Sequence, residues 1–436
     1  MENKQLRIVI GVALQDAGEA TRALEIACGI RDFCPAGWSV DIIFLSHGSL
    51  FAHMITDAGF TIYDCSPRFH GRNFREDLKT QFPELAGDVS IARDVILGER
   101  AALQELKPDL VIYGFWPFTN IARRMQGIPG ICFLPLPLHQ SVVGSALLQD
   151  VPDTIKPLTS LPLAVRRTLV KLIPARVKTN APGFRQRYIC RAAEAASWTG
   201  PPLNNLFDLL QADLTLVIDL PEFYVSATLP ANFRITGPLY ASAASETPLD
   251  PAILRLFDPA ERRPKIFCTM GSSGIKEHLL AAITALTSGK GTAWNSVILV
   301  PPTICPLEEA LAHAGDHPHV YLTDAFVPAP RVNALADIVV CHGGQGTVQT
   351  ALASGTPLVG VAMQMEQQIN LDHLVVAGTA IRIPIHRWQP AAIQAAVERI
   401  ITHLSYREKA RRLQQRINSM DGRKEIALRI WKFVLG

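Results

Sequence analysis

The stretch DIVVCHGGQGTVQTALASGTPLVGVAMQMEQQIN, residues 337–370, decides the fold of the second half of the chain. A short apolar run, residues 338–341, ends in a histidine and two glycines, and a helix is predicted over 346–354. That helix ends at a glycine, and a second apolar run over 357–363 follows it. The pattern predicts a strand, a glycine turn, the start of a helix and a parallel strand.

The glycine turn has the chemistry of an anion site. Glycines let a ligand approach the backbone closely, and a helix start offers unpaired N–H groups together with the positive end of its dipole. His342 and the hydroxyl of Thr347 add side-chain donors. The parts suit a diphosphate. Glu366 and Gln367, which follow the next strand, carry groups that match sugar hydroxyls.

The order HGG-x-GT, then small-Gly-x-Pro, then Glu-Gln-x-x-Asn closely resembles the donor-binding signature of GT-B glycosyltransferases. These enzymes form the UDP-glycosyltransferase superfamily, and the likeness is greatest to its bacterial macrolide-type branch. The resemblance implies a UDP- or dTDP-sugar donor whose sugar is held by Glu366 and Gln367, and whose base lies at Phe326 and Val327. It implies a diphosphate site made of His342, Gly343, Gly344, Gly346, Thr347 and, on a second turn, Ser272 and Ser273.

Length and composition fit a globular protein of more than one domain. The chain has 436 residues, of which 48% are hydrophobic and 19% charged. The net charge is +3, which does not indicate a polyanion-binding protein, and we predict no nucleic-acid partner. Eight scattered cysteines without a C-x-x-C pair, and no signal peptide, favour a reducing cytoplasm.

Apolar runs alternate with helical patterns in both halves, which predicts α/β domains with doubly wound parallel sheets. With the resemblance, the expected fold is GT-B, two Rossmann-like domains facing across a cleft. We predict an N-terminal acceptor-binding domain over 1–240, a linker over 241–251 and a nucleotide-sugar-binding domain over 252–420. The last segment, 421–436, is predicted to be a helix that packs back toward the N-terminal domain.

The first strand–helix turn departs from the family pattern. Glu19 stands where the family usually carries its general-base histidine, and Gly114 or a neighbour stands where the family has the aspartate that holds it. The family's aspartate serves to hold the histidine, so it loses its function when the histidine is absent. The absence of both residues together is therefore chemically consistent. A partly buried glutamate could take the acceptor proton alone if its pKa is raised, and Glu19 is our candidate base.

Three alternatives to this role stay open. Glu19 could simply complement the dipole of its helix start. An acidic or preactivated acceptor would need no base. A nearby histidine could serve instead, the candidates being His47, His53, His70 and His139.

A basic stretch separates the two halves of the first domain. Nine Lys or Arg and no acidic residue occur between Asp153 and Glu194, and part of the stretch is predicted to be an amphipathic helix that ends before Pro174. The stretch has three interpretations. Residues 156–191 could make peripheral contact with the inner face of an anionic membrane, or they could form a cap over an acidic acceptor. They could also be a solvated basic face over a packed helix.

The resemblance thus implies an inverting hexosyltransferase that acts on a small-molecule or lipid acceptor, with no cofactor beyond the co-substrate. No DxD-type metal motif is present, and we expect a metal-independent reaction. A monomer and a homodimer are both compatible with the sequence. Two alternatives are a catalytically silent nucleotide-sugar-binding partner protein, motivated by the absent His/Asp pair, and a UDP-sugar 2-epimerase.

Overall fold

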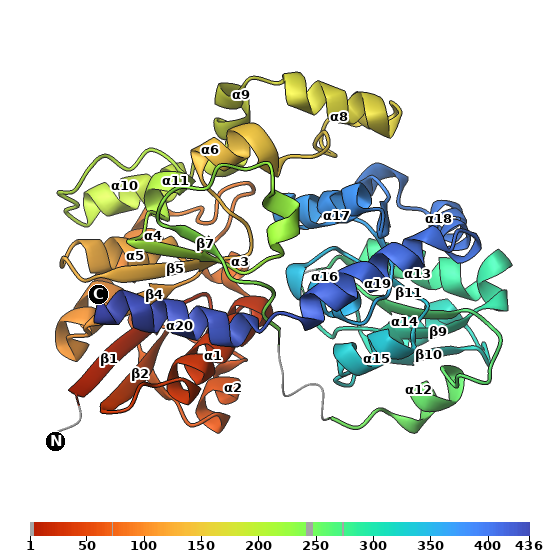
Figure 1. Ribbon diagram of the computed structural model, residues 1–436, viewed down its shortest axis with the longest axis horizontal. Coiled ribbons are helices and arrows are strands. Elements are labelled where there is room, and N and C mark those ends of the chain that lie inside the picture. Colours follow the sequence, from red (N-terminus) through yellow and green to blue (C-terminus); the bar gives the residue numbers. More distant parts are fainter. Residues whose placement is uncertain (1–3, 72, 241–246, 273) are drawn as a thin grey trace. The chain divides into compact units, whose positions relative to one another are not determined.

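The computed structural model describes residues 4–71, 73–240, 247–272 and 274–436. Their contacts divide the chain into two compact units. Unit 1 contains residues 1–147, 173–239 and 421–436, and unit 2 contains 148–172 and 240–420. Each unit is built around one parallel sheet with helices packed on both of its faces (Figure 1).

The sheet of unit 1 has the strand order β3-β2-β1-β4-β5-β6-β7, and every neighbouring pair is parallel. Its strands are β1 (Lys4–Gly11), β2 (Trp38–Ser46), β3 (Thr61–Asp64), β4 (Leu110–Tyr113), β5 (Gly130–Leu134), β6 (Leu214–Val217) and β7 (Phe233–Ile235). The strands nearest the centre are apolar throughout because helices cover both faces. Strand order reverses between β1 and β4, and ligands of such sheets bind at this switch point.

Two long helices of unit 1 begin at aspartate caps. Asp16 caps the first helix and Asp88 the fourth, each by accepting backbone N–H groups of the first turn. The helices are α1 (Ala17–Asp32), α2 (Ala52–Asp57), α3 (Phe74–Asp77), α4 (Val89–Leu106), α5 (Pro117–Arg124), α6 (Gln140–Val142), α9 (Ala175–Thr179), α10 (Arg187–Ala195), α11 (Leu206–Leu209) and α20 (Gly422–Leu435). The last of these, α20, lies beside α1 (Figure 1), and the indole N–H of Trp431 donates to the carbonyl of Ile30 at 3.1 Å.

The sheet of unit 2 has the order β10-β9-β8-β11-β12-β13 and is also parallel throughout. Its strands are β8 (Lys265–Thr269), β9 (Asn295–Leu299), β10 (Val320–Thr323), β11 (Ile338–Cys341), β12 (Leu358–Gly360) and β13 (Ala380–Arg382). Here the switch point lies between β8 and β11.

Helices of unit 2 come mainly from the crossovers of this sheet. They are α7 (Lys156–Thr159), α8 (Leu163–Leu172), α12 (Pro251–Leu256), α13 (Lys276–Thr287), α14 (Leu307–Ala314), α15 (Ala329–Leu335), α16 (Gln345–Ala353), α17 (Met365–Ala377), α18 (Pro390–Thr402) and α19 (Ser405–Asn418). Among the described residues no helix is both long enough and apolar enough to cross a bilayer.

Two features differ from the sequence-based expectations. The apolar run predicted as a strand over 357–363 is a strand only over Leu358–Gly360, because the chain turns after it to start α17. Residues 148–172, placed by the sequence in the 1–240 domain, group with unit 2. Part of the predicted linker, residues 241–246, lies outside the described residues.

Candidate functional site

The first candidate site is the switch point of unit 2, where His342 follows β11. Its ring is buried, with 6% of the residue exposed. A Cβ atom added to Gly271, after β8, would lie 2.3 Å from the ring carbon Cε1, and one added to Gly344 would lie 2.4 Å from Nε2. The imidazole therefore occupies space that only glycines on both sides leave free.

The start of α16 leaves room for a ligand. Gly344 is the N-cap residue of this helix, and as a glycine it has no side chain to accept the backbone N–H groups of the first turn. A Cβ atom added to Gly346 would meet nothing within 4 Å, and Thr347 beside it is half-buried. Positive dipole, free space and a hydroxyl therefore occur together at the first turn. We call residues 342–347 the His342 elbow.

The start of α17 is tied to the elbow. The amide of Asn370 donates both to the carbonyl of Gly343 at 3.1 Å and to Oε1 of Glu366 at 2.8 Å. Glu366 is half-buried. Gln367 is 2% exposed, and its Oε1 accepts the N–H of Met363 at 2.9 Å. Gln367, one of the two residues predicted to hold the donor sugar, thus uses its side-chain oxygen to stabilise the turn that precedes α17.

The other predicted donor residues follow β8 and β10 of the same sheet, which are separated by β9. Ser272 follows β8 and is exposed, whereas Ser273 lies outside the described residues. Phe326 follows β10 and is 72% exposed, while Val327 is only 7% exposed. An exposed aromatic ring beside a buried anchor suits stacking on a nucleotide base.

The second candidate site is the switch point of unit 1, which joins two positions that the sequence analysis singled out separately. Glu19 lies in the first turn of α1, after β1, and Gly114 directly follows β4. A Cβ atom added to Gly114 would lie only 1.9 Å from Oε2 of Glu19. The glutamate side chain fills the space that a larger residue at 114 would need. We call Glu19, Arg22, Gly114 and Phe115 the Glu19 corner.

Opposing forces act on the Glu19 carboxyl group. Burial, which leaves 6% of the residue exposed, raises its pKa, and the charge of Asp16 acts in the same direction. Arg22, whose Nη2 lies 3.0 Å from Oε1, lowers the pKa, as does the N–H of Phe115, which donates to Oε2 at 3.2 Å. Burial prevails, so the pKa is above that of an ordinary glutamate.

A buried charge cluster that the sequence analysis did not find joins residues 148–172 to unit 2. Arg382, at the end of β13, pairs with Asp150 at 2.7 Å and with Asp372 at 2.5 Å, and also with Asp153. Arg166 of α8 adds a second cation 3.1 Å from Asp150. The available signal was the pair of aspartates at 150 and 153, which stand directly before a stretch without acids.

Three carboxylates face two guanidinium groups in this cluster, so its net charge is −1 when all are ionised. Burial, reinforced by the neighbouring Asp150, raises the pKa of Asp372 to about 7 against the opposing effect of Arg382. The carboxylates in turn raise the pKa of Arg382, which stays charged. Gln368 lies on α17, the same helix as Asp372. Its carboxamide donates to the carbonyl of Val151 at 2.9 Å and accepts the N–H of Asp153 at 3.1 Å.

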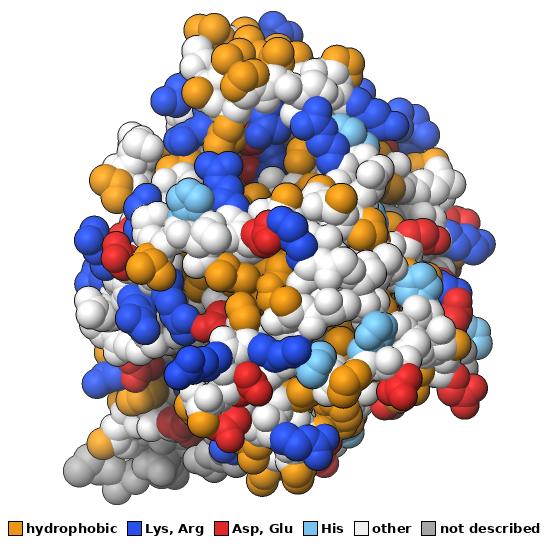
Figure 2. Space-filling view, turned by 90° about the vertical axis from the view of Figure 1, so that its right-hand side faces the viewer, with side chains coloured by type: hydrophobic (Ala, Val, Ile, Leu, Met, Phe, Trp, Pro, Cys, Tyr) orange, Lys and Arg blue, Asp and Glu red, His pale blue; other side chains and the backbone are white. Residues whose placement is uncertain are grey.

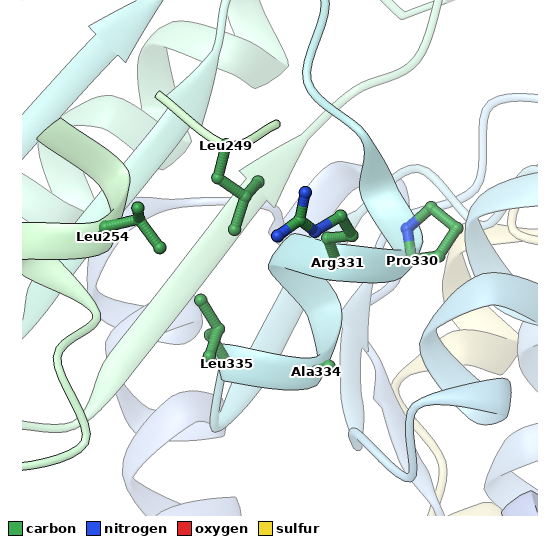
Figure 3. A pocket seen from close by; sticks show the side chains of 6 residues that line it. All are labelled: Leu249, Leu254, Pro330, Arg331, Ala334 and Leu335. Atoms are coloured by element: carbon green, nitrogen blue, oxygen red, sulfur yellow. The ribbon is translucent and has the colours of Figure 1, made fainter. Parts of the chain in front are cut away.

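A separate apolar pocket of about 390 Å³ lies between α12 and α15 (Figure 3). It is lined by Leu249, Leu254, Pro330, Arg331, Ala334 and Leu335. Arg331 donates to the carbonyl of Thr247 at 2.6 Å. None of the lining residues belongs to the predicted donor site.

Comparisons with known proteins agree with this geometry. Residues 308–433 match the family model "Erythromycin biosynthesis protein CIII-like, C-terminal domain". The chain is 27% identical over 327 residues to the PGL/p-HBAD biosynthesis glycosyltransferase of Mycobacterium tuberculosis, covering 74% of this chain and 70% of the relative.

Solved structures share the fold along the whole chain. The glycotransferase of kitacinnamycin has a TM-score of 0.66 at 19% identity and covers 99% of both chains. Spinosyn rhamnosyltransferase SpnG complexed with thymidine diphosphate has a TM-score of 0.61 at 13% identity, covering 98% of this chain and 100% of that one. The family match and the curated relative make the chain similar to macrolide-type, UDP-glycosyltransferase-like glycosyltransferases, and the solved structures show that its fold is GT-B.

Proposed function

We propose that this protein transfers a hexose from a UDP- or dTDP-sugar to a small-molecule or lipid acceptor, with inversion at the anomeric carbon. The observation that carries the proposal is the His342 elbow, where a helix start without a side-chain cap borders free space at Gly346. Thymidine diphosphate in the complex of the similar SpnG supports a nucleoside diphosphate as the leaving group.

In this reaction an acceptor oxygen forms a bond to the anomeric carbon while the bond from that carbon to the diphosphate breaks. Negative charge develops on the departing diphosphate. Backbone N–H groups of the first turn of α16, with the hydroxyl of Thr347 and the ring of His342, would stabilise that charge without a metal ion. Glu366, oriented by Asn370, would bind hydroxyl groups of the transferred sugar.

The acceptor proton would go to Glu19. Its raised pKa makes the carboxylate a stronger base than an ordinary glutamate, and Arg22 would stabilise the ionised form between turnovers. The glycine at 114 supports this role, since it makes space for the glutamate where the resemblance places an aspartate.

A second candidate function is nucleotide-sugar binding without turnover. The observation that favours it is the low exposure of Glu19, whose two carboxylate oxygens both already have protein partners. In this case the Glu19 corner would only stabilise the start of α1.

A turnover assay separates the two functions. Wild-type protein is incubated with UDP- and dTDP-sugars and a panel of hydroxyl-bearing acceptors, and release of nucleoside diphosphate and glycosylated product is measured. We expect acceptor-dependent product in the wild type and its loss in Glu19→Ala and His342→Ala. Nucleotide binding by calorimetry without product from any acceptor would support the binding protein. Conversion of the UDP-sugar alone to its 2-epimer would support the epimerase.

A further inference from the structure

Helix α8 buries Val170, as an ordinary surface helix would, but it also buries an arginine and exposes several of its other apolar residues, a partial reversal of the usual pattern. Arg166 is 9% exposed and faces the interior of unit 2, whereas Leu172 is 73% and Val165 44% exposed. Val165, Leu169 and Leu172 follow each other at helical spacing and form one stripe. The sequence pattern predicted a stripe of this kind, and in the structure its first and last residues, Val165 and Leu172, are exposed to solvent.

The reversal is held in place by the buried charge cluster. Arg166 pairs with Asp150, which in turn pairs with Arg382 of β13. Before the helix, Thr159 bonds His386 at 3.1 Å, and Ser160 accepts from Arg387 at 3.0 Å. Turning the apolar stripe inward would break the Arg166 pair and leave a buried carboxylate with one partner fewer. The outward stripe is therefore a fixed surface.

Exposed apolar side chains also occur at the first residue of α8 and in the residues that precede it. Ile155 is 42%, Leu161 37% and Leu163 36% exposed. Figure 2 shows hydrophobic side chains together with Lys and Arg at its upper end, the end of unit 2 at which Figure 1 places α8. Single exposed leucines are common, but a cluster of them in 18 consecutive residues, 155–172, marks an interaction surface.

The charged residues within 155–172 are all positive. Lys156 and Lys171 are exposed and Arg167 is half-buried, and no acidic residue occurs in the sequence from 154 to 193. Apolar side chains flanked by cations alone complement a surface that offers hydrocarbon beneath negative charge. A cap over an acidic acceptor would use these cations but would not need the exposed side chains of Val165 and Leu172.

We propose that residues 155–172 dock the protein on the surface of a bilayer that contains anionic lipids. The ten residues of α8 would lie in the plane of the interface, with Val165 and Leu172 inserted between headgroups and the cations at phosphate level. The inference does not depend on the donor site or on glycosyl transfer. Of the three interpretations that the sequence left open for the basic stretch, we thus choose contact with an anionic membrane.

Vesicle sedimentation of the full chain tests the proposal. Vesicles of phosphatidylcholine alone are compared with vesicles containing about one-third phosphatidylglycerol. We expect binding only to the anionic vesicles, weakened by salt. Val165→Ser/Leu172→Ser should lower the partition coefficient at least about tenfold. Arg167→Gln/Lys171→Gln should lower it roughly 25-fold, at about fivefold for each charge.

Matched controls lie elsewhere on unit 2. Leu404 is 71% exposed, nearly the value of Leu172, and Arg411 and Arg412 are exposed on α19. Leu404→Ser and Arg411→Gln/Arg412→Gln should bind vesicles like the wild type. All substituted side chains are at the surface, and circular dichroism checks that each variant is folded.

Three outcomes would overturn the proposal. The wild type could fail to bind anionic vesicles. The control variants could lose as much binding as the α8 variants, which would indicate unspecific adsorption. Light scattering could instead reveal a concentration-dependent dimer that Val165→Ser/Leu172→Ser abolishes without vesicles, which would make a second copy of the chain the occupant.

Discussion

The two switch points of this protein solve the same geometric problem in opposite ways. In unit 2 the candidate side chain, His342, follows the second strand of the switch, and the glycine that makes room for it, Gly271, follows the first. In unit 1 the order is inverted: Glu19 follows the first strand and Gly114 the second. Parallel sheets bring these loops together at one edge, so either strand can supply the reactive group.

The two corners differ in what they leave open. The Glu19 corner is closed, because the carboxylate is buried and bonded by Arg22 and Phe115. The His342 elbow is open at Gly346. A site that binds a large anion needs volume, whereas a site that moves one proton needs a tuned pKa. The difference therefore fits a division of labour between donor binding and proton transfer.

The largest expected effect comes from Glu19→Gln. The substitution keeps the acceptor for the N–H of Phe115 and removes the base, so kcat should fall roughly a thousandfold. Calorimetry should show unchanged affinity for nucleoside diphosphate. Activity within a few-fold of the wild type would show that Glu19 has only a structural role. Glu105→Gln, an exposed position of unit 1, provides the matched control.

A pair of glycine substitutions tests the openness of the elbow. Gly344→Ala should displace the ring of His342, and Gly346→Ala should place a methyl group in the ligand's space. Each should weaken binding of UDP or dTDP about 10- to 100-fold, as expected for one or two lost bonds to a charged group.

Stability separates these two variants. Gly346→Ala adds a helix-favouring residue and meets no protein atom, so it should leave the melting temperature equal or higher. Gly344→Ala should lower it. Nucleotide binding by Gly346→Ala at wild-type strength would show that the diphosphate does not occupy this turn.

The pH profile tests the tuned pKa of the Glu19 corner. Only the ionised carboxylate accepts a proton, so kcat/KM should fall as pH decreases through the raised pKa of Glu19. Arg22 lowers this pKa, and Arg22→Met should move the acidic limb to higher pH. An unmoved limb would assign the titration to another group.

The smallest effect concerns the second buried carboxyl group with a raised pKa, Asp372. Its neutral form is favoured in the folded state, so its contribution to stability is present below pH 4 and is lost as pH rises through about 7. Asp372→Asn should flatten this decline in the free energy of unfolding. Its acidic limb of kcat/KM should stay at the wild-type position, which distinguishes the cluster from the Glu19 corner.

Sequence reasoning succeeded where the signal was local. The elbow is contiguous, so its strand, glycines and helix start could be predicted together, and β11 has the predicted bounds. Glu19 and Gly114 were both singled out, but their contact depends on β1 and β4 being neighbours. Residues 95 apart in sequence meet there only through the topology of the sheet.

Three other features could not be predicted from local sequence patterns: helix α17, the pairing of Arg382 with Asp150, and the direction in which the apolar stripe of α8 faces. Helix α17 is buried on nearly all sides, including Asn370, Asp372 and His373, so it lacks the polar face that makes a helix recognisable. Arg382 and Asp150 are 232 positions apart, and nothing local pairs them. The outward stripe of α8 has the same spacing as a packed one, and periodicity alone does not say which side faces the core.

The excursion of residues 148–172 into unit 2 limits how this protein can be recombined with its relatives. The chain passes between the units after residues 147, 172, 239 and 420. A hybrid joined at 240 would combine Arg382 and Asp372 of one parent with the 150–166 loop of the other. Unless that loop carried equivalent aspartates, the hybrid would bury an unbalanced charge. We expect functional hybrids only when this loop is inherited together with the C-terminal half.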